Sequence, residues 1–230
     1  MEHARGLMAF YADIAPEAVE DYRRWHNCEH MLERVSIPGF RRGRRYAGHP
    51  GAPGFLMMYE TADAAVLGSA AYRAALDAPT PWTRRALTWF RNPVRNIYAL
   101  AASAGAAPAS PAPALFTLRF NLVGEGAEAA RRALCETRLQ ALAARPDVAR
   151  ARLWAIDEEI SAIVTSERKI YGGGPGAQRW LAMVETTHAD ANVALAELIG
   201  GDEAFADVFF DRFWLDFALE APRPAEGGAS

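Results

Sequence analysis

The feature that most constrains the fold of this chain is a pattern that occurs twice, once in each half. The segment YAGHPGA at residues 46–52 resembles YGGGPGA at residues 171–177. The same register then continues without a gap: Leu56, Met58, Glu60 and Thr61 match Leu181, Met183, Glu185 and Thr186. A constant offset over this many positions indicates an internal duplication. The chain is therefore expected to fold as two similar units.

Residue periodicity predicts the same order of elements in both halves. In the first half the expected strands span residues 6–14, 40–46, 55–61 and 94–100, and the expected helices span 17–35, 63–77 and part of 82–92. In the second half the expected strands span 115–123, 180–186 and 209–219, the helices span 125–144 and 189–206, and a long extended region covers 148–171. The resulting order, βαββαβ, is that of a ferredoxin-like unit. The prediction is an α+β fold built from two tandem units of this kind.

Composition divides the chain at one place. Residues 101–113, AASAGAAPASPAP, have the composition of a semi-extended Ala/Pro linker. They separate a first unit at residues 1–100 from a second unit at 114–221, and residues 222–230 are expected to be a disordered tail. Helices cover one face of each predicted sheet, so the bare faces must find cover elsewhere. We expect the two units to pack sheet to sheet, as an intrachain α+β barrel, with the site in the space between them.

Alternation along the first strand of each unit predicts which side chains face that space. In the first unit the apolar set under the helices is Met8, Phe10, Ala12 and Ile14, which leaves Ala9, Tyr11 and Asp13 for the space. In the second unit the corresponding apolar set is Phe116, Leu118, Phe120 and Leu122, which leaves Thr117, Arg119 and Asn121. The space is thus expected to hold a phenol, a carboxylate, an arginine and an amide. The alternative is that this end of the sheet is simply solvated.

Charge and composition exclude several classes of protein. The net charge is −3, with 25 basic against 28 acidic residues, which argues against a nucleic-acid partner held by overall charge. The two cysteines, Cys28 and Cys135, supply neither a disulfide framework nor a cysteine-rich zinc site. Residues 1–10 lack the apolar core of a signal peptide, and no apolar run is long enough to cross a bilayer. We expect a soluble, cytoplasmic protein without a nucleic-acid or membrane partner.

The densest chemistry lies on one predicted helix, in the run WHNCEHMLER at residues 25–34. Helical spacing places His26, His30 and Glu33 on one face with Glu29 beside it, and puts Trp25, Leu32 and Val35 on a more apolar stripe. The pattern His26-x-x-Glu29-His30 fits the H-x-x-E-H zinc motif of inverted metallopeptidases. A metal-free interpretation is acid–base chemistry, because a carboxylate beside His30 can orient it and raise its pKa. The third interpretation is a solvated surface network of Glu29, Glu33 and Arg34.

Four arginines follow on the next predicted strand, at positions 41, 42, 44 and 45. This patch is too short to serve as a nucleic-acid surface in an acidic protein. Strand alternation sends its members to opposite faces, so one or two of them are expected to reach the site and hold an anionic or enolate oxygen.

These residues resemble a known family. The run from Trp25 to Arg34, followed by IPGF at 37–40 and RRY at 44–46, is similar to the W-x-x-x-EH…PGF…RRY pattern of the dimeric α+β barrel superfamily, and closest to its EthD-like and related bacterial branches. The motif covers about residues 25–46, and the topology covers both halves. The resemblance implies that ferredoxin-like units pair through their sheets and that small, often aromatic or lactone-like molecules bind between sheet and helices.

The family's chemistries include isomerases, dehydratases, cofactor-free monooxygenases and, in some branches, haem enzymes. Its Glu-His pair falls on Glu29 and His30, and its arginine and tyrosine fall on Arg45 and Tyr46. The second half departs from the pattern, because Thr137 and Arg138 stand where Glu29 and His30 would be. An active site would therefore be single and built on the first half, with the second half as a structural lid.

The leading hypothesis is a cofactor-independent enzyme acting on a small cyclic or aromatic oxygenated metabolite by isomerisation, elimination or cyclisation. His30 would move a proton and Glu29 would orient or charge it. The predicted substrate-binding residues are Arg45, Tyr46, Asp13, Tyr11, His26, Trp25 and Arg119.

Two other functions stay open. The first is a haem- or metal-dependent oxidoreductase, including a monooxygenase, with His26, His30 or His188 as candidate ligands of haem or a divalent metal. The second is a non-catalytic protein that binds a small ligand. Whether two copies of the chain pair into a homodimer is also left open.

Overall fold

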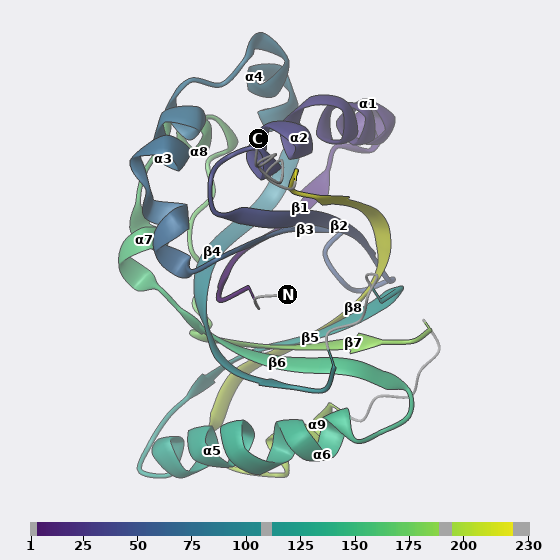
Figure 1. Cartoon of the computed structure of the whole chain (residues 1–230), viewed down its shortest axis with the longest axis vertical. Coiled ribbons are helices and arrows are strands. Elements are labelled where there is room, and N and C mark those ends of the chain that lie inside the picture. Colours follow the sequence, from purple (N-terminus) through teal and green to yellow (C-terminus); the bar gives the residue numbers. More distant parts are fainter. Residues whose placement is uncertain (1–3, 107–111, 189–194, 223–230) are drawn as a thin grey trace, which may run out of the picture.

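Eight strands form one closed antiparallel barrel in the computed structural model, which describes residues 4–106, 112–188 and 195–222 (Figure 1). The strands are β1 (Gly6–Ile14), β2 (Phe40–Gly48), β3 (Phe55–Thr61), β4 (Phe90–Ala104), β5 (Ala114–Leu122), β6 (Val148–Ile156), β7 (Trp180–Thr186) and β8 (Phe205–Glu220). Their order around the barrel is β1-β3-β2-β8-β5-β7-β6-β4. Each half contributes four adjacent strands in the same relative order, and the pairs β2–β8 and β4–β6 join the halves edge to edge.

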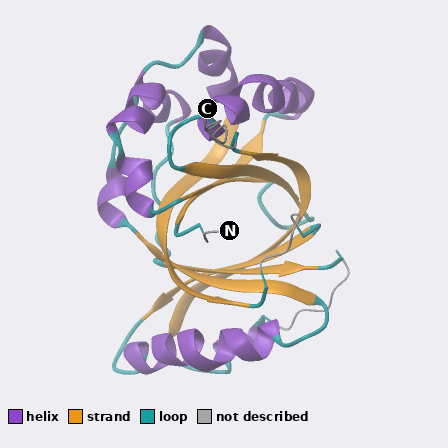
Figure 2. Ribbon diagram, viewed as in Figure 1, coloured by secondary structure: helices purple, strands orange, loops and turns teal. Residues whose placement is uncertain are grey.

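The helices lie outside the barrel and gather on two opposite sides of it (Figure 2). The first half contains the 3-10 helix η1 (Pro16–Ala18), α1 (Val19–Trp25), the π-helix η2 (His26–His30), α2 (Met31–Val35), the 3-10 helix η3 (Ala64–Gly68), α3 (Ala70–Asp77) and α4 (Pro81–Leu87). The second half contains α5 (Ala127–Ala133), the π-helix η4 (Leu134–Arg138), α6 (Leu139–Ala143), α7 (Glu158–Ala162), α8 (Ser166–Tyr171) and α9 (Ala196–Ile199). No helix within the described ranges is long and apolar enough to span a membrane.

Strand alternation sorts the side chains as the sequence predicts. The apolar residues of β1 pack in the core beneath the first-half helices, and those of β5 pack beneath the second-half helices. The residues between them, such as Ala9 and Tyr11, join a third apolar cluster within the barrel. The barrel is thus a packed interior with its own core, and helices add a separate core on each side.

Charged side chains fill one part of the barrel interior. Glu60 on β3 and Glu185 on β7 share the guanidinium group of Arg44, which donates to both carboxylates. Arg152 also contacts both, at 2.9 Å from Glu60 Oε1 and 3.2 Å from Glu185 Oε2. Arg150 Nε donates to Glu185 Oε2 at 2.8 Å. Because these groups are almost fully buried, they form a fixed ionic cluster where the sequence predicts an open space for a ligand.

Two predicted boundaries are wrong. Residues 101–104 of the predicted linker continue strand β4 and pair with β6, while 107–111 lie outside the described residues. The predicted helix at 189–206 overlaps only the short helix α9, because β8 already begins at Phe205; residues 189–194 are not described. The predicted tail lies outside the described residues from position 223 onward, and it stays a prediction.

The predicted extended region at 148–171 is a strand followed by two short helices, α7 and α8. Asp157 Oδ1 accepts a hydrogen bond from Ile160 N, and Thr165 Oγ1 accepts one from Arg168 N, so each helix has a side-chain N-cap. The capping residues Asp157 and Thr165 were the sequence signal that could have predicted these two helices. Both helices belong to the second half in sequence but pack against elements of the first half. Helix α7 contacts η3 and β4, and helix α8 contacts α3 and α4.

The motif-bearing helix contains a π-helical turn. The N–H of Met31 bonds to the carbonyl of His26, five residues earlier. One extra residue in a turn rotates the faces that follow. Arg34 therefore follows His26 and His30 on the buried face in place of Glu33, and Leu32 is exposed although α-helical spacing predicts it in the apolar stripe.

Candidate functional site

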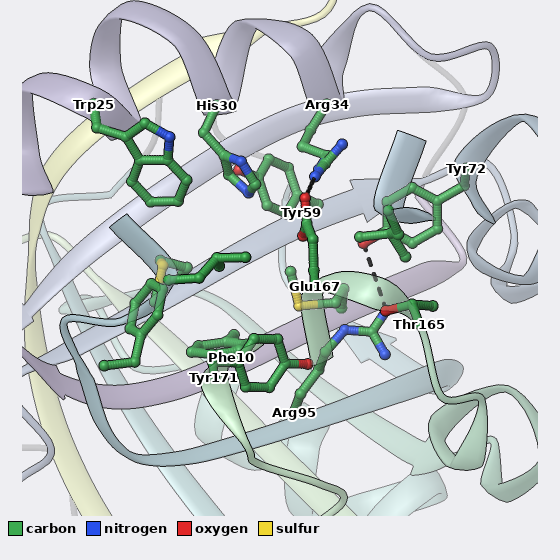
Figure 3. A pocket seen from close by; sticks show the side chains of 15 residues that line it. Phe10, Trp25, His30, Arg34, Tyr59, Tyr72, Arg95, Thr165, Glu167 and Tyr171 are labelled. Atoms are coloured by element: carbon green, nitrogen blue, oxygen red, sulfur yellow. Dashed lines mark hydrogen bonds and ion pairs between the residues drawn. The ribbon is translucent and has the colours of Figure 1, made fainter. Parts of the chain in front are cut away.

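A small cavity of about 40 Å³ lies between the outer face of the first-half strands and the helices that cover it. Apolar and aromatic side chains form most of its wall (Figure 3), namely Met8, Phe10, Trp25, Met57, Leu76, Leu87 and Phe90. The polar groups in the wall are His30, Arg34, Tyr59, Tyr72, Arg95, Thr165, Glu167 and Tyr171. An apolar pocket with a few convergent polar groups is the common form of a small-molecule site.

His30 is the histidine that faces this cavity. Its side chain comes from the π-helix η2 and is 8% exposed. Its Nδ1 atom is buried and has no hydrogen-bond partner in the described part of the chain. Burial, the Arg34 guanidinium and His26 hold the pKa of His30 well below the usual histidine range. The cavity wall therefore contains an imidazole that is neutral at neutral pH.

Glu29 does not pair with His30, contrary to the sequence prediction. Its Oε1 atom accepts hydrogen bonds from Thr80 Oγ1 at 2.7 Å and from Thr83 Oγ1 at 3.1 Å. Thr83 Oγ1 in turn accepts a hydrogen bond from Trp25 Nε1 at 3.1 Å, and the Trp25 ring lies 4.3 Å from the His30 ring, centroid to centroid. Glu29 is thus connected to His30 only through Thr83 and Trp25, and its hydrogen bonds join helix α4 to the motif helix.

Replacing Glu29 tests this placement. Glu29→Gln is expected to lower the free energy of unfolding by about 1 to 2 kcal/mol, because two threonines lose a charged acceptor. The NMR titration of His30 should stay where it is in the wild type, because the carboxylate does not touch the imidazole. Thr83→Val removes the link to Trp25 as well and should be the more destabilised variant. A clear shift of the His30 titration in Glu29→Gln would show that the two groups interact directly.

A buried ion pair joins the two halves at the cavity. Arg34, on α2 of the first half, pairs with Glu167, on α8 of the second half (Figure 3). Burial raises the pKa of Glu167, although Arg34 opposes the shift. Arg34 Nη1 makes no hydrogen bond in the described structure and lies 3.6 Å from Glu33 Oε2. One arm of the guanidinium is thus fixed by Glu167, and the other faces the carboxylate of Glu33.

His26 is fully buried and lies beside the cavity, and its two ring nitrogens have partners. Its Nδ1 is 3.1 Å from Arg45 Nη1, and its Nε2 is 3.3 Å from the Tyr59 hydroxyl oxygen. An arginine can only donate, so His26 Nδ1 accepts and the ring carries its proton on Nε2. That proton points to the Tyr59 oxygen. The Tyr59 hydroxyl hydrogen is then free to donate to a group in the cavity that Tyr59 lines.

The other predicted substrate-binding residues lie apart from this cavity. Arg45 is held under α1 by Asp216 at 2.7 Å and by Asn27 Oδ1 at 2.8 Å. Tyr46 lies within the barrel, where its hydroxyl accepts a hydrogen bond from Arg44. Asp13 accepts a hydrogen bond from Gly54 N at 2.8 Å and one from the Asn92 side-chain amide.

Tyr11 and Arg119 form a second group within the barrel. The Arg119 guanidinium stacks over the Tyr11 ring at 4.2 Å and pairs with Asp211 at 2.9 Å. Of the nine predicted site residues, the structure therefore places two, Trp25 and His30, in the cavity wall. Sequence reasoning missed Arg34, Tyr59, Tyr72, Arg95 and Glu167, which come from α2, β3, α3, β4 and α8. The π-helical turn hid Arg34, and the tertiary packing of α8 brought in Glu167.

The buried histidines make stability depend on pH. Burial, Arg45 and Arg34 hold the pKa of His26 well below its usual range, as burial and Arg34 do for His30. Below about pH 6.5 the unfolded chain takes up protons at these positions while the folded chain does not, so stability falls as the pH falls. Glu167, whose pKa is raised, acts in the opposite direction. The wild type should therefore lose up to about 1.4 kcal/mol per pH unit more than His30→Gln between pH 6 and 5, as measured by urea unfolding. Parallel curves for the two proteins would contradict the assignment of His30.

Comparison with known proteins identifies the fold. No family model matches the sequence, and no curated protein matches it significantly. Among solved structures, an anthrone oxidase-like protein matches with a TM-score of 0.64 and 11% identity, covering 96% of this chain and 94% of that chain. A protein from Fusobacterium nucleatum named as a monooxygenase matches with a TM-score of 0.60 and 7% identity, covering 97% of this chain and all of that chain.

A protein named as a chlorite dismutase matches with a TM-score of 0.53 and 10% identity, covering 93% of this chain and 95% of that chain. These matches are to dimeric α+β barrel proteins, and they extend over nearly the whole chain. This chain shares their fold. At such low identities the likeness establishes the fold and leaves the activity to the site.

Of the predicted ligands of haem or a divalent metal, His26 and His188 are not placed to bind such a group. His26 has a hydrogen-bond partner at each ring nitrogen, and His188 is exposed after β7. His30 faces a cavity of about 40 Å³, which would have to widen for haem as for any aromatic ligand. No group of three or more metal-ligating side chains occurs within the described ranges.

Proposed function

We propose that this chain is a cofactor-independent enzyme that removes a proton from a small aromatic oxygenated molecule bound in the first-half cavity, with His30 as the base. The observation that carries the proposal is the neutral His30 imidazole, whose buried Nδ1 has no partner in the described structure, in a cavity walled by aromatic rings. An unpartnered buried nitrogen of this kind is costly unless a ligand or water satisfies it. The fold supports an enzyme, because the matched proteins carry enzyme names.

The proton-transfer step uses groups that surround His30. A C–H bond next to a carbonyl breaks, its proton goes to the imidazole, and its electron pair moves to the carbonyl oxygen. The hydroxyl hydrogen of Tyr59 is the donor that would stabilise the resulting oxyanion, and the positive charge of Arg34 in the cavity wall adds to this stabilisation. The low pKa of His30 limits its strength as a base before reaction. Negative charge that develops beside it in the transition state favours the imidazolium, so the interaction strengthens when it is needed.

The fate of the enolate decides the reaction class. Return of the proton to another atom completes an isomerisation, and loss of a neighbouring leaving group completes an elimination. Reaction with dioxygen completes an oxidation, and the names of the matched proteins favour this outcome. For anthrone the balance is one anthrone and one dioxygen giving one anthraquinone and one water.

Substrate entry requires the cavity to widen. In the described structure it has room for a few water molecules. One wall is the short helix α8, which is held by the Arg34–Glu167 pair and by the Ser166 N–H on Asp77 Oδ1. Because α8 is the part of the wall that comes from the second half, we propose that this segment moves when substrate enters, and that the second half thereby serves as the lid of the first-half site.

Two measurements with anthrone as the first probe test the proposed function. Under argon in D₂O, the enzyme should accelerate deuterium exchange at the acidic CH₂ group, as followed by NMR. In air, an oxygen electrode and the absorbance of anthraquinone show whether the enolate is oxidised with the stated balance. Exchange without oxygen uptake indicates an isomerase or lyase. Binding without exchange would support the non-catalytic ligand-binding alternative and overturn the proposed function.

We also propose that the two halves are ferredoxin-like units that arose by duplication. Glu60 and Glu185, which match in sequence, occupy equivalent positions on β3 and β7 and join one ionic cluster. Both halves place a π-helical turn in the helix that follows their first strand. Tyr46 and Tyr171, which also match, lie on a strand and a helix, so the equivalence does not extend to the preceding segment. A cytoplasmic location and a homodimer stay predictions.

A further inference from the structure

Arg95 is a buried cation without a counter-ion. It lies on β4, and its side chain is 8% exposed and forms part of the cavity wall (Figure 3). Its side-chain hydrogen bond is a long one, from Nη2 to the Tyr72 hydroxyl at 3.5 Å. In the part of the chain that the structure describes, no carboxylate forms an ion pair with it. A buried charge in this state is unfavourable unless a ligand supplies the opposite charge.

The charges around the cavity do not cancel. Glu167 is the carboxylate in the cavity wall; it pairs with Arg34 and also attracts Arg95. Glu33 lies 3.6 Å from Arg34 and is not part of the wall. His30 is held neutral by burial and by Arg34. The wall thus holds two guanidinium groups and one carboxylate, so the cavity favours a monoanion.

Neutral donors surround Arg95. Tyr72 contributes the hydroxyl described above, and the Tyr171 ring lies beside Arg95 (Figure 3). Burial raises the pKa of Tyr171 to about 12, so its phenol keeps its proton at neutral pH and can donate it. Phe10 and Phe90 pack around the Tyr171 ring at centroid distances of 5.1 and 6.4 Å. The end of the cavity near Arg95 thus combines a guanidinium and phenol donors with aromatic walls.

We propose that the substrate is an aromatic carboxylate, whose carboxylate binds to Arg95 and the hydroxyls of Tyr72 and Tyr171. The inference rests on the proposed function and names the substrate class of that site. A planar guanidinium matches the two oxygens of a carboxylate, which favours this anion over a phenolate with its single oxygen. The ring of the substrate packs against the aromatic walls, and its reacting carbon lies toward His30.

The same charge assists the base. A carboxylate bound to Arg95 removes excess positive potential from the cavity, so proton uptake by His30 becomes less unfavourable. An aromatic acid would thus bring with it part of the charge that the imidazolium requires. A neutral aromatic ligand of the same shape would leave His30 the weaker base.

Binding of two matched probes tests the proposal. Isothermal titration calorimetry is done with 2-naphthoate and with its neutral isostere 2-naphthamide, on the wild type and on Arg95→Met, Arg95→Lys and Arg84→Met. The wild type should bind naphthoate at least about tenfold more tightly than naphthamide, as expected of a charged hydrogen-bonded pair. Arg95→Met should lose this preference without loss of affinity for naphthamide. Arg95→Lys should be intermediate, because it keeps the charge without the planar fork.

Arg84 is the matched control, since it is an exposed arginine on α4 outside the cavity wall. Arg84→Met changes the net charge equally and should bind both probes as the wild type does. A structural role for Arg95 would make Arg95→Met less stable, whereas removal of an uncompensated charge should leave its thermal midpoint unchanged or raise it. Equal affinity of the wild type for both probes, no binding of naphthoate at millimolar concentration, or an unchanged preference in Arg95→Met would overturn the proposal.

The outcome is separable from that of the proposed function. The preference for naphthoate should persist in His30→Gln, because binding at Arg95 does not need the base. A carboxylate preference without any exchange dependent on His30 would refute the proposed function alone. Exchange dependent on His30 without a carboxylate preference would refute this inference alone.

Discussion

His30→Gln is expected to lower the rate of deuterium exchange, and of any turnover that follows it, by about 100- to 10,000-fold. Glutamine has a similar size and keeps polar atoms in the cavity, but it cannot take up a proton. The fold should persist, because the buried Nδ1 of His30 makes no hydrogen bond to the described residues that would be lost. Exchange is measured by NMR under argon, so that the oxidation step does not mask the proton transfer.

His188→Gln is the matched control for this variant. His188 is exposed in the turn after β7, outside the cavity wall, and its replacement should leave the rate unchanged. Circular dichroism and the thermal midpoint confirm that each variant is folded. A His30→Gln protein that exchanges anthrone within about threefold of the wild-type rate would remove His30 from the role of base.

Glu185→Gln is expected to lower the free energy of unfolding by about 3 to 5 kcal/mol, the usual cost of breaking a buried ion pair on one side. Its carboxylate accepts hydrogen bonds from Arg44, Arg150 and Arg152 inside the barrel. Burial acts to raise the pKa of Glu185, but these three arginines hold it well below its usual range. An amide of the same shape leaves the arginines with too little negative charge. Urea unfolding at pH 7 measures the difference.

The contribution of Glu185 to the free energy of unfolding should decrease as the pH falls. Because its folded pKa is depressed, its contribution to stability is fully present above the ordinary pKa of about 4.3 and is lost as the pH falls toward the folded value. The destabilisation of Glu185→Gln should therefore shrink below pH 4.

Glu128→Gln is the control for the barrel variant. Glu128 forms an exposed pair with Arg131 on α5, and its replacement should leave the unfolding curve unchanged. A loss below about 1 kcal/mol in Glu185→Gln would show that the ionic cluster does not hold the barrel together.

Several features of the fold could be read directly from the sequence. The alternation of apolar residues gave β1, β3 and β7 their observed bounds, because each strand must bury one set of side chains under helices and another within the barrel. The matched Glu60 and Glu185 pointed to equivalent positions on two strands. Periodicity also predicted the helix over residues 17–35, and helical spacing put His26 and His30 on one face of it.

The location of the site could not be read in the same way. Sequence reasoning placed it between the sheets, where Tyr11, Tyr46 and Arg119 do lie, but close packing and the ionic cluster fill that space. The inner faces of the two sheets must be kept from water, and paired charged side chains that fill the barrel interior do this without a ligand. The cavity lies instead between sheet and helices, on the other face of β1, where the family resemblance implies that ligands bind.

The sequence by itself determined most of the strands, the two faces of β1 and β5, and a helix that carries His26 and His30 on one face, because these depend on periods of two and about four residues along the chain. Only the tertiary structure showed that Arg34, and not Glu33, is the residue on the buried face. It also showed that Glu29 and Trp25 both hydrogen-bond to Thr83, and that Glu167 of the second half pairs with Arg34 of the first. The physical reason is that these contacts join residues up to 133 positions apart, and a local period carries no information about which distant groups meet. Arg95, an arginine with no distinguishing sequence context, becomes informative only when its burial without a counter-ion is seen.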